Sequence, residues 1–186
     1  MFRATWTKLA IAGMNQSPKR AALRQAVGEG LLTRVRANSV VDWLPLDVHI
    51  SVADATVTVL GVAGARAFWK ERLLAAFKTR TMAPFVAGAS FVFGEQPYAL
   101  MKIAMSAYKL MARNAGYLSV SSGGKGFVLV DFLEMPALLV ESKGWHAICH
   151  GQCEAVFHYL DMPGEITLSD VSASSFRYTM KCGSAG

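Results

Sequence analysis

The sequence has few charges, no membrane-spanning run and no cysteine framework. Charged residues make up 17% of the 186-residue chain and hydrophobic residues 53%, which excludes disorder and favours one domain with a substantial core. No uncharged run reaches the roughly 18 residues that span a bilayer, so we expect no transmembrane segment. The three cysteines do not have the spacing of a disulfide framework, and we expect a reduced, cytoplasmic protein.

Acidic residues are almost missing from the first part of the chain. Residues 1–38 contain seven Lys and Arg but a single acid, Glu29, and they hold the whole net charge of +6. Such a basic segment could bind nucleic acid, anionic lipid or an acidic protein partner, or could form a solvent-exposed helical face with no partner. Because it has no recognised nucleic-acid-binding motif, we expect no nucleic-acid binding. The candidate basic interaction face consists of Lys19, Arg20, Arg24, Arg34 and Arg36.

The common catalytic and nucleotide-binding signatures are also missing. The segments GVAGAR and SGGKG have neither the spacing of a dinucleotide-binding fingerprint nor that of a phosphate-binding loop. The segment GASFVFG lacks the second glycine of a nucleophile elbow. No pair of carboxylates stands out from ordinary surface scatter. We therefore expect that the protein is not an enzyme.

The first part of the chain has helical periodicity. Ser17 and Pro18 predict the N-cap and the first helical position of one helix. Residues 47–60 suit a buried helix, although their β-branched run ATVTVL could also be a strand. The uncharged segment 81–94 also suits a buried helix.

The clearest helix begins at Pro97 and ends before Gly116. Its interior polar residues recur at spacings of about one helical turn, so they form a single narrow stripe. The other faces are apolar and rich in methionine, a residue that adapts to irregular space. This helix is therefore predicted to be a central core helix or the wall of a cavity.

After Asn114 the period changes to two, which is typical of strands. A hairpin is predicted from strands 117–121 and 126–132 around Gly123-Gly124, and two further strands follow Pro163-Gly164. We predict an α+β fold over residues 1–186 as a single domain. A basic helical segment (1–38) and a helical half (39–116) pack on a β-β-α-β-β half (117–182). That last half is an antiparallel four-stranded sheet with a helix between its strand pairs.

The segment GWHAICHGQCEAVFHYLD holds most of the histidines and cysteines. On a helix, Cys149 and Cys153 fall in the apolar stripe, where free cysteine often packs as a small hydrophobe. His146 and His150 form an i,i+4 pair that could share a metal ion with Cys153. No second ligand cluster occurs in the sequence, and HAICH lacks the first thiol that covalent haem attachment needs. We therefore expect no zinc site and no haem attached in this way.

Several segments in order, from VVDWLPLDVH through FVFGEQPYALM and RNAGYLSV to GWHAICHGQCEAVFHYL, resemble a paralogous family of myxobacterial proteins. The second half also resembles the superfamily of 4-vinyl-reductase-type ligand-binding domains, haem–nitric-oxide/oxygen-binding domains and trafficking-complex subunits. In its haem members, a histidine of the helical half binds the iron and a Tyr-x-Ser-x-Arg motif holds the haem propionates. Tyr117 and Ser119 match that motif, but Ser121 replaces the arginine, and no histidine lies between His49 and His146.

From this resemblance we expect a non-enzymatic sensory domain in bacterial signalling that binds a small hydrophobic ligand, without a cofactor. The alternative is a dimerising interaction or scaffold module of the same fold with no ligand. A homo-oligomer or a protein partner is expected in either case. The candidate pocket residues are Met101, Met105, Tyr108, Phe127 and Trp145.

Overall fold

The N-terminal part of the chain consists of three short helices and a small two-stranded sheet. The computed structural model describes residues 1–79, 83–84, 87–88, 96–124 and 126–183. The elements of this part are β1 (Phe2–Arg3), α1 (Ala4–Gln16), α2 (Arg20–Val27), α3 (Glu29–Ala37) and β2 (Trp43–Leu44). The strands β1 and β2 pair in antiparallel fashion, Phe2 with Leu44. The N-cap predicted at Ser17 is wrong, because Ser17 follows the end of α1 and α2 begins at Arg20.

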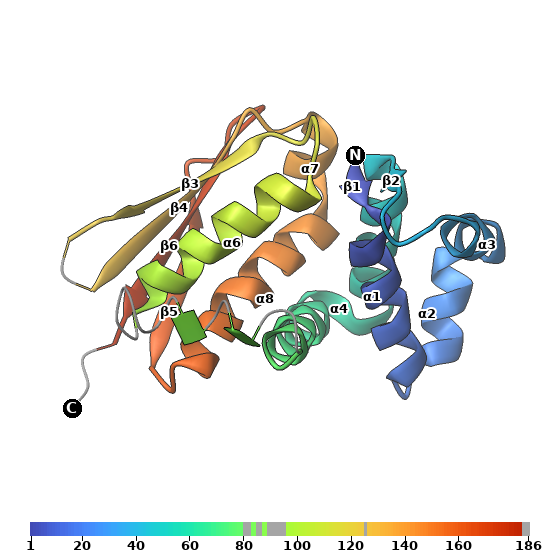
Figure 1. The fold of residues 1–186 in the computed structure, drawn as a ribbon, viewed down its shortest axis with the longest axis horizontal. Helices are drawn as coiled ribbons and strands as arrows, with labels where there is room; N and C mark the ends of the chain where they lie inside the picture. Colours follow the sequence, from blue (N-terminus) through green and yellow to red (C-terminus); the bar gives the residue numbers. More distant parts are fainter. Residues whose placement is uncertain (80–82, 85–86, 89–95, 125, 184–186) are drawn as a thin grey trace.

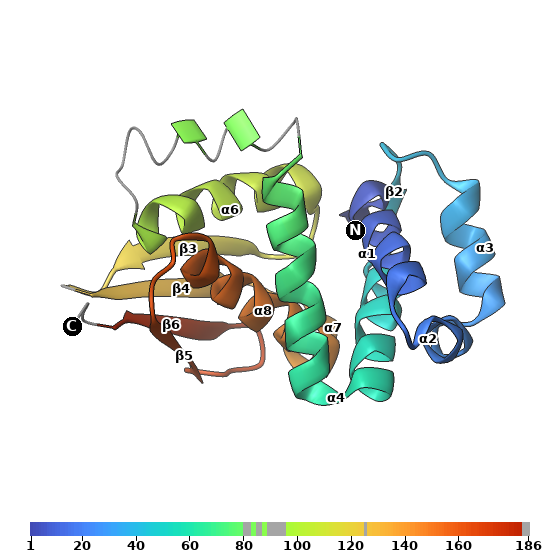
Figure 2. The ribbon, with the colours of Figure 1, turned by 90° about the horizontal axis from the view of Figure 1, so that it is seen from below.

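The longest helix, α4 (Leu46–Phe77), consists of two arms that meet at Gly61. Gly61 has φ 72° and ψ 170°, a backbone conformation that interrupts the helix and that glycine adopts at no steric cost. Figure 2 shows the result as a V, with the first arm beside α1 and the second beside α8. Across the bend, the Trp69 indole N–H donates to the Thr56 hydroxyl at 3.2 Å. The run ATVTVL is therefore helical rather than a strand.

The second half contains the sheet and the helices that cover it. Its elements are α6 (Pro97–Met111), β3 (Tyr117–Ser122), β4 (Phe127–Leu133), α7 (Ala137–Glu141), α8 (Lys143–Tyr159), β5 (Gly164–Ser169) and β6 (Phe176–Cys182). All neighbours in the sheet are antiparallel, in the order β3-β4-β6-β5. Helices α6 and α8 lie on one face of this sheet, as Figure 1 shows. The predicted α+β architecture and its β-β-α-β-β half are confirmed.

Helix α8 is the element that joins the two halves. Its glycines allow close approach to both arms of α4: a Cβ on Gly144 would lie 2.4 Å from the Asp54 amide nitrogen, and one on Gly151 would lie 2.5 Å from the Arg66 carbonyl oxygen. The Asp54 carboxylate also accepts hydrogen bonds from the Ser142 hydroxyl at 2.8 Å and the Gly144 amide at 2.7 Å. The N-terminus of α8 is thereby fixed to the first arm of α4.

Helix α4 has the length and composition of a membrane-spanning helix. It is nevertheless bent at Gly61, and its arms pack against α1, α2 and α8, as those of a core helix do. The predicted buried helix over 81–94 lies mostly outside the described residues; residues 83–84 and 87–88, which are described, are helical but exposed, so they do not support the predicted burial.

Candidate functional site

The place where α1, both arms of α4, α6 and α8 meet is called the junction below, and it contains the buried histidine His49. The His49 ring is completely buried, and burial lowers its pKa to about 4, so the imidazole is neutral near pH 7. Its Nδ1 lies 3.0 Å from the Thr7 hydroxyl oxygen, whereas its Nε2 has no hydrogen-bond partner in the described part of the chain. When Nδ1–H donates to Thr7, Nε2 carries a free lone pair, which is the form of histidine that binds metals.

Aromatic rings enclose this histidine. The Trp6 ring stacks on it at 5.4 Å between centroids, and the Phe2 ring lies at 4.9 Å. The rings of Trp69 and Trp145 lie at 6.1 and 6.4 Å. These side chains come from β1, α1, α4 and α8, so the cluster joins elements that are far apart in the sequence. The junction is thus dominated by flat apolar surfaces around two buried polar atoms that lack a partner among the described residues, His49 Nε2 and the Trp145 indole Nε1.

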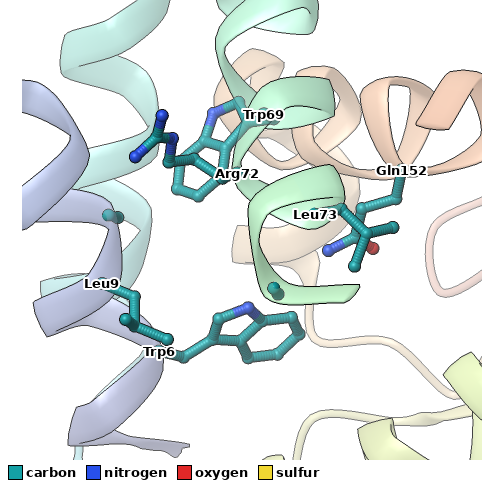
Figure 3. A pocket seen from close by; sticks show the side chains of 8 residues that line it. Trp6, Leu9, Trp69, Arg72, Leu73 and Gln152 are labelled. Carbon is teal, nitrogen blue, oxygen red and sulfur yellow. The ribbon is translucent and has the colours of Figure 1, made fainter. Parts of the chain in front are cut away.

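Two small pockets lie at the junction, and the first of them includes the Trp6 and Trp69 rings of this aromatic cluster. Both pockets are lined by Leu73 and Gln152. Each has a volume of about 60 Å³. Figure 3 shows the first pocket, which lies between α1, the second arm of α4 and α8. Its lining consists of Trp6, Leu9, Ala10, Trp69, Arg72, Leu73, Ala76 and Gln152. The second pocket lies between α4, α6 and α8 and is lined by Leu73, Phe77, Leu100, Met101, Ile103, Ala104, Ala107, Gln152 and Val156.

The residues predicted to line a pocket fall in different places. Met101 lines the second pocket, and Trp145 belongs to the aromatic cluster. Tyr108 is buried, its ring lies 6.3 Å from that of Trp145, and its hydroxyl donates to the Ala115 carbonyl oxygen at 2.5 Å. Met105 packs against the core. Phe127 lies elsewhere, in a groove of about 460 Å³ between the start of α6 and the β3–β4 hairpin.

The histidines and cysteines of α8 have other partners. His146 Nε2 lies 2.8 Å from the Val140 carbonyl oxygen, and its Nδ1 lies 3.2 Å from the Tyr178 hydroxyl, so both ring nitrogens are engaged. His150 Nδ1 lies 3.1 Å from a carboxylate oxygen of Glu154. Cys153 is buried, and burial raises the pKa of its thiol to about 12. Within the described ranges, no three His, Cys, Asp or Glu side chains are grouped so that they could hold a metal ion.

The predicted basic face lies on α2, α3 and the turn before α2. Arg24 and Arg36 both pair with Glu29, at 3.0 and 2.9 Å. Lys19, Arg20 and Arg34 are exposed. The role of this face as an interaction surface stays a prediction.

Sequence reasoning missed most of the junction. Trp6, Trp69, Leu73, Arg72 and Gln152 were not among the predicted pocket residues. His49 entered only as the residue before the stretch without histidine that ends at His146. The one local signal was a lone histidine in the apolar run of residues 46–60. Its unpartnered Nε2 depends on contacts with α1 and α8, which no local pattern encodes.

No known family pattern and no curated protein matches the sequence. Solved structures do match in fold. A mutant of the Fe(II) unliganded H-NOX protein from K. algicida has a TM-score of 0.70 and 8% identity, and the match covers 100% of this chain and 98% of that one. An H-NOX mutant from T. tengcongensis has a TM-score of 0.63 and 10% identity, with 97% of each chain covered.

An oxygen-binding H-NOX domain related to soluble guanylate cyclases, as its oxygen complex, has a TM-score of 0.59 and 10% identity. The match covers 97% of this chain and 94% of that domain. The haem–nitric-oxide/oxygen-binding domains, one of the superfamily relatives expected from the sequence, thus share the fold. The resemblance to a myxobacterial paralogous family gains no support from these comparisons.

These neighbours correct the expectation that the protein has no cofactor. Their names refer to Fe(II), to an oxygen complex and to heme distortion, so haem is the group that this fold implies. The sequence argument failed because it considered only a histidine between residues 49 and 146 and the arginine replaced by Ser121. The structure offers a different donor, since the Nε2 atom of His49 is buried and has no partner among the described residues.

The donor atom therefore fits haem, whereas the space in this conformation is too small for it. Ligand pockets commonly measure about 300–1,000 Å³, and the two pockets at the junction measure about 60 Å³ each. A porphyrin beside His49 requires that the rings of Trp6 and Phe2 move away from it. What the comparisons establish is the fold: from one end to the other, the chain has the architecture of the H-NOX domains.

Proposed function

We propose that this protein is a cytoplasmic, non-enzymatic sensory domain that binds its ligand at the junction. The observation that carries the proposal is the whole-chain match to H-NOX structures, at a TM-score of 0.70 with 100% of this chain covered. The surroundings of His49 also support the proposal. Buried polar atoms in proteins usually have hydrogen-bond partners, but the His49 Nε2 atom has none in the described part of the chain. A bound ligand would provide the partner that the His49 Nε2 atom lacks.

Haem is the first ligand to test. His49 would hold it, because a neutral imidazole that donates through Nδ1 presents Nε2 to iron, and Thr7 would fix the ring orientation. Bound haem would supply an iron atom that binds small diatomic gases. The described residues would exclude water from that iron, since the rings nearest to His49 are apolar on their faces.

The structure also suggests how binding could be signalled. The first arm of α4 carries His49 and packs with α1 and α2, and α8 contacts both arms of α4. A ligand that separates Trp6 from His49 would change the packing of α1 on the first arm of α4. The bend at Gly61 and the Trp69–Thr56 hydrogen bond are the connections across which such a change would pass.

The proposal is tested by adding haem to the purified protein and following the Soret absorbance, together with native mass spectrometry of protein purified from cells supplied with haem. We expect one haem per chain. In His49→Ala the Soret maximum should shift and haem should be lost more easily, whereas His158→Ala, an exposed control on α8, should behave as the parent.

A second pair of variants tests the location. Ala76→Phe and Ala104→Phe fill the first and the second pocket and should weaken binding, while Ala21→Phe, exposed on α2, should not. If neither haem nor any co-purified small molecule binds the folded protein, the proposed function is wrong.

A further inference from the structure

One positively charged side chain lines the first pocket, whose other lining residues are apolar except for Gln152. Arg72 extends from the second arm of α4 along the edge of this pocket toward α1, as Figure 3 shows. Its Nη1 lies 3.3 Å from the Gln16 side-chain oxygen, which is a long hydrogen bond. Its Nε is buried and has no hydrogen-bond partner among the described residues. No carboxylate of the described chain pairs with it.

The protein makes room for this arginine. Gly13 of α1 faces it so closely that a Cβ atom there would lie 2.5 Å from Arg72 Cδ. The guanidinium also lies over the Phe68 ring, at 5.7 Å from its centroid. Arg72 is therefore held in one place by α1 and by its own helix, although its charge is not neutralised there. An arginine fixed in this way offers two parallel N–H groups to a carboxylate.

The second pocket shares part of its lining with the first, and no charged side chain lines it. The two pockets share Leu73 and Gln152, and the remaining lining of the second comes from apolar side chains of α4, α6 and α8. A ligand that extends from one pocket into the other would have its polar end near Arg72 and its apolar end near Ile103 and Val156. Both pockets are small, at about 60 Å³ each, which suits an unbranched chain better than a globular molecule.

We infer that the junction binds an aliphatic carboxylate, with the carboxylate on the Arg72 guanidinium and the hydrocarbon chain in the second pocket. This inference rests on the proposed function and specifies a ligand class for the same site. The wall that must yield to admit the chain includes Leu73 and Gln152, which line both pockets, and Leu9 of the first pocket, a residue that is 57% exposed. Burial of the chain supplies the affinity, and the arginine selects the anion over neutral analogues.

The inference is tested by calorimetric titration with three probes of equal chain length: octanoate, octanol and octylamine. Octanoate should bind at least about tenfold more tightly than octanol, as expected for a charge-assisted hydrogen bond, and octylamine should not bind measurably. Arg72→Gln should lower the octanoate affinity to that of octanol without changing octanol binding. Lys70→Gln makes the same charge change on the same helix outside the pocket and should leave all affinities unchanged.

The outcomes separate this inference from the proposed function. If octanoate and octanol bind equally, or if Arg72→Gln retains the preference for the anion, the inference is wrong while ligand binding at the junction stands. If no probe binds but haem does, the aliphatic class is wrong and the sensory proposal survives. If Arg72→Gln does not fold, Arg72→Lys is used instead. This variant keeps the positive charge and should retain part of the preference for octanoate over octanol.

Discussion

Gly151 of α8 lies directly against Arg66 of α4, so closely that a Cβ atom on the glycine would be 2.5 Å from the arginine carbonyl oxygen. Gly144 has the same relationship to the first arm of α4, where its Cβ would lie 2.4 Å from the Ala53 carbonyl carbon. The contact between α4 and α8 is the most extensive one between elements of the chain. The junction therefore depends on two positions in α8 that tolerate no side chain.

The first prediction concerns these glycines. Gly151→Ala should lower the free energy of unfolding by about 1–3 kcal/mol, because the backbone of α4 must shift to accommodate the methyl group. Gly30→Ala is the matched control, since nothing lies within 4 Å of a Cβ there and the residue is in helix α3. That control should stabilise the protein by up to about 1 kcal/mol. Urea unfolding measures both, and equal stability of the two variants would contradict the close packing.

The second prediction concerns the carboxylate of Asp54. Asp54→Ala removes the acceptor of the Ser142 and Gly144 hydrogen bonds. This change should lower the free energy of unfolding by about 1.5–3 kcal/mol. Asp54→Asn keeps an acceptor oxygen and should cost less. Asp47→Ala, an exposed acid in the first turn of the same helix, should cost no more than about 1 kcal/mol. If the Asp54 and Asp47 variants unfold at the same urea concentration, the bridge to α8 does not stabilise the fold.

The third prediction is a pH dependence of stability due to His49. Burial lowers its pKa to about 4 in the folded protein, whereas the unfolded value is about 6.5. The unfolded state therefore binds more protons than the folded state between these two pH values. As a result, the free energy of unfolding is not reduced by His49 above pH 6.5 and decreases as the pH drops toward 4. The free energy of unfolding falls by up to about 3 kcal/mol over this pH range.

His49→Gln should flatten this part of the pH profile in urea-unfolding experiments. The pKa values of His146 and His150 are also lowered by burial and act in the same direction. The difference between parent and variant therefore isolates the contribution of His49. A variant whose profile keeps the full slope between pH 6.5 and 4 would show that His49 is not the buried neutral group.

The fourth prediction concerns the thiols. Cys149 and Cys153 are buried, and burial raises their pKa values, that of Cys153 to about 12. Cys182 is only partly buried, at the end of β6. With a colorimetric disulfide reagent at pH 8, we expect one fast thiol in the native protein and three after denaturation. Cys182→Ser should remove the fast reaction, and rapid labelling of that variant would be inconsistent with an inward-facing α8.

Local sequence pattern predicted the elements whose periodicity is strong. The β3–β4 hairpin around Gly123-Gly124 was predicted within about one residue, and the helix predicted from Pro97 begins there but ends at Met111, before the predicted end next to Gly116. The inward orientation of Cys149 and Cys153 also followed from the spacing of apolar residues, because burial of one helix face imposes that spacing.

Features that depend on distant contacts could not be read in this way. The pairing of Phe2 with Leu44 joins two very short strands, which leave no periodic signal. Gly61 marked a break in α4, but the direction of its second arm follows from packing against α8. The cofactor was excluded on the basis of two motif positions, and the match to H-NOX structures, which a local motif does not encode, contradicts that exclusion.

The most direct test of the account is a methyl NMR titration of the folded protein with haem and, separately, with octanoate. Ile103 and Met101 line the second pocket, whereas Ile166 in β5 lies outside both pockets and serves as the internal reference. We predict that at least one of the two ligands, at stoichiometric concentration, shifts or broadens the Ile103 and Met101 methyl signals while Ile166 stays unchanged. Spectra in which neither ligand affects Ile103 and Met101 more than Ile166 would contradict binding at the junction.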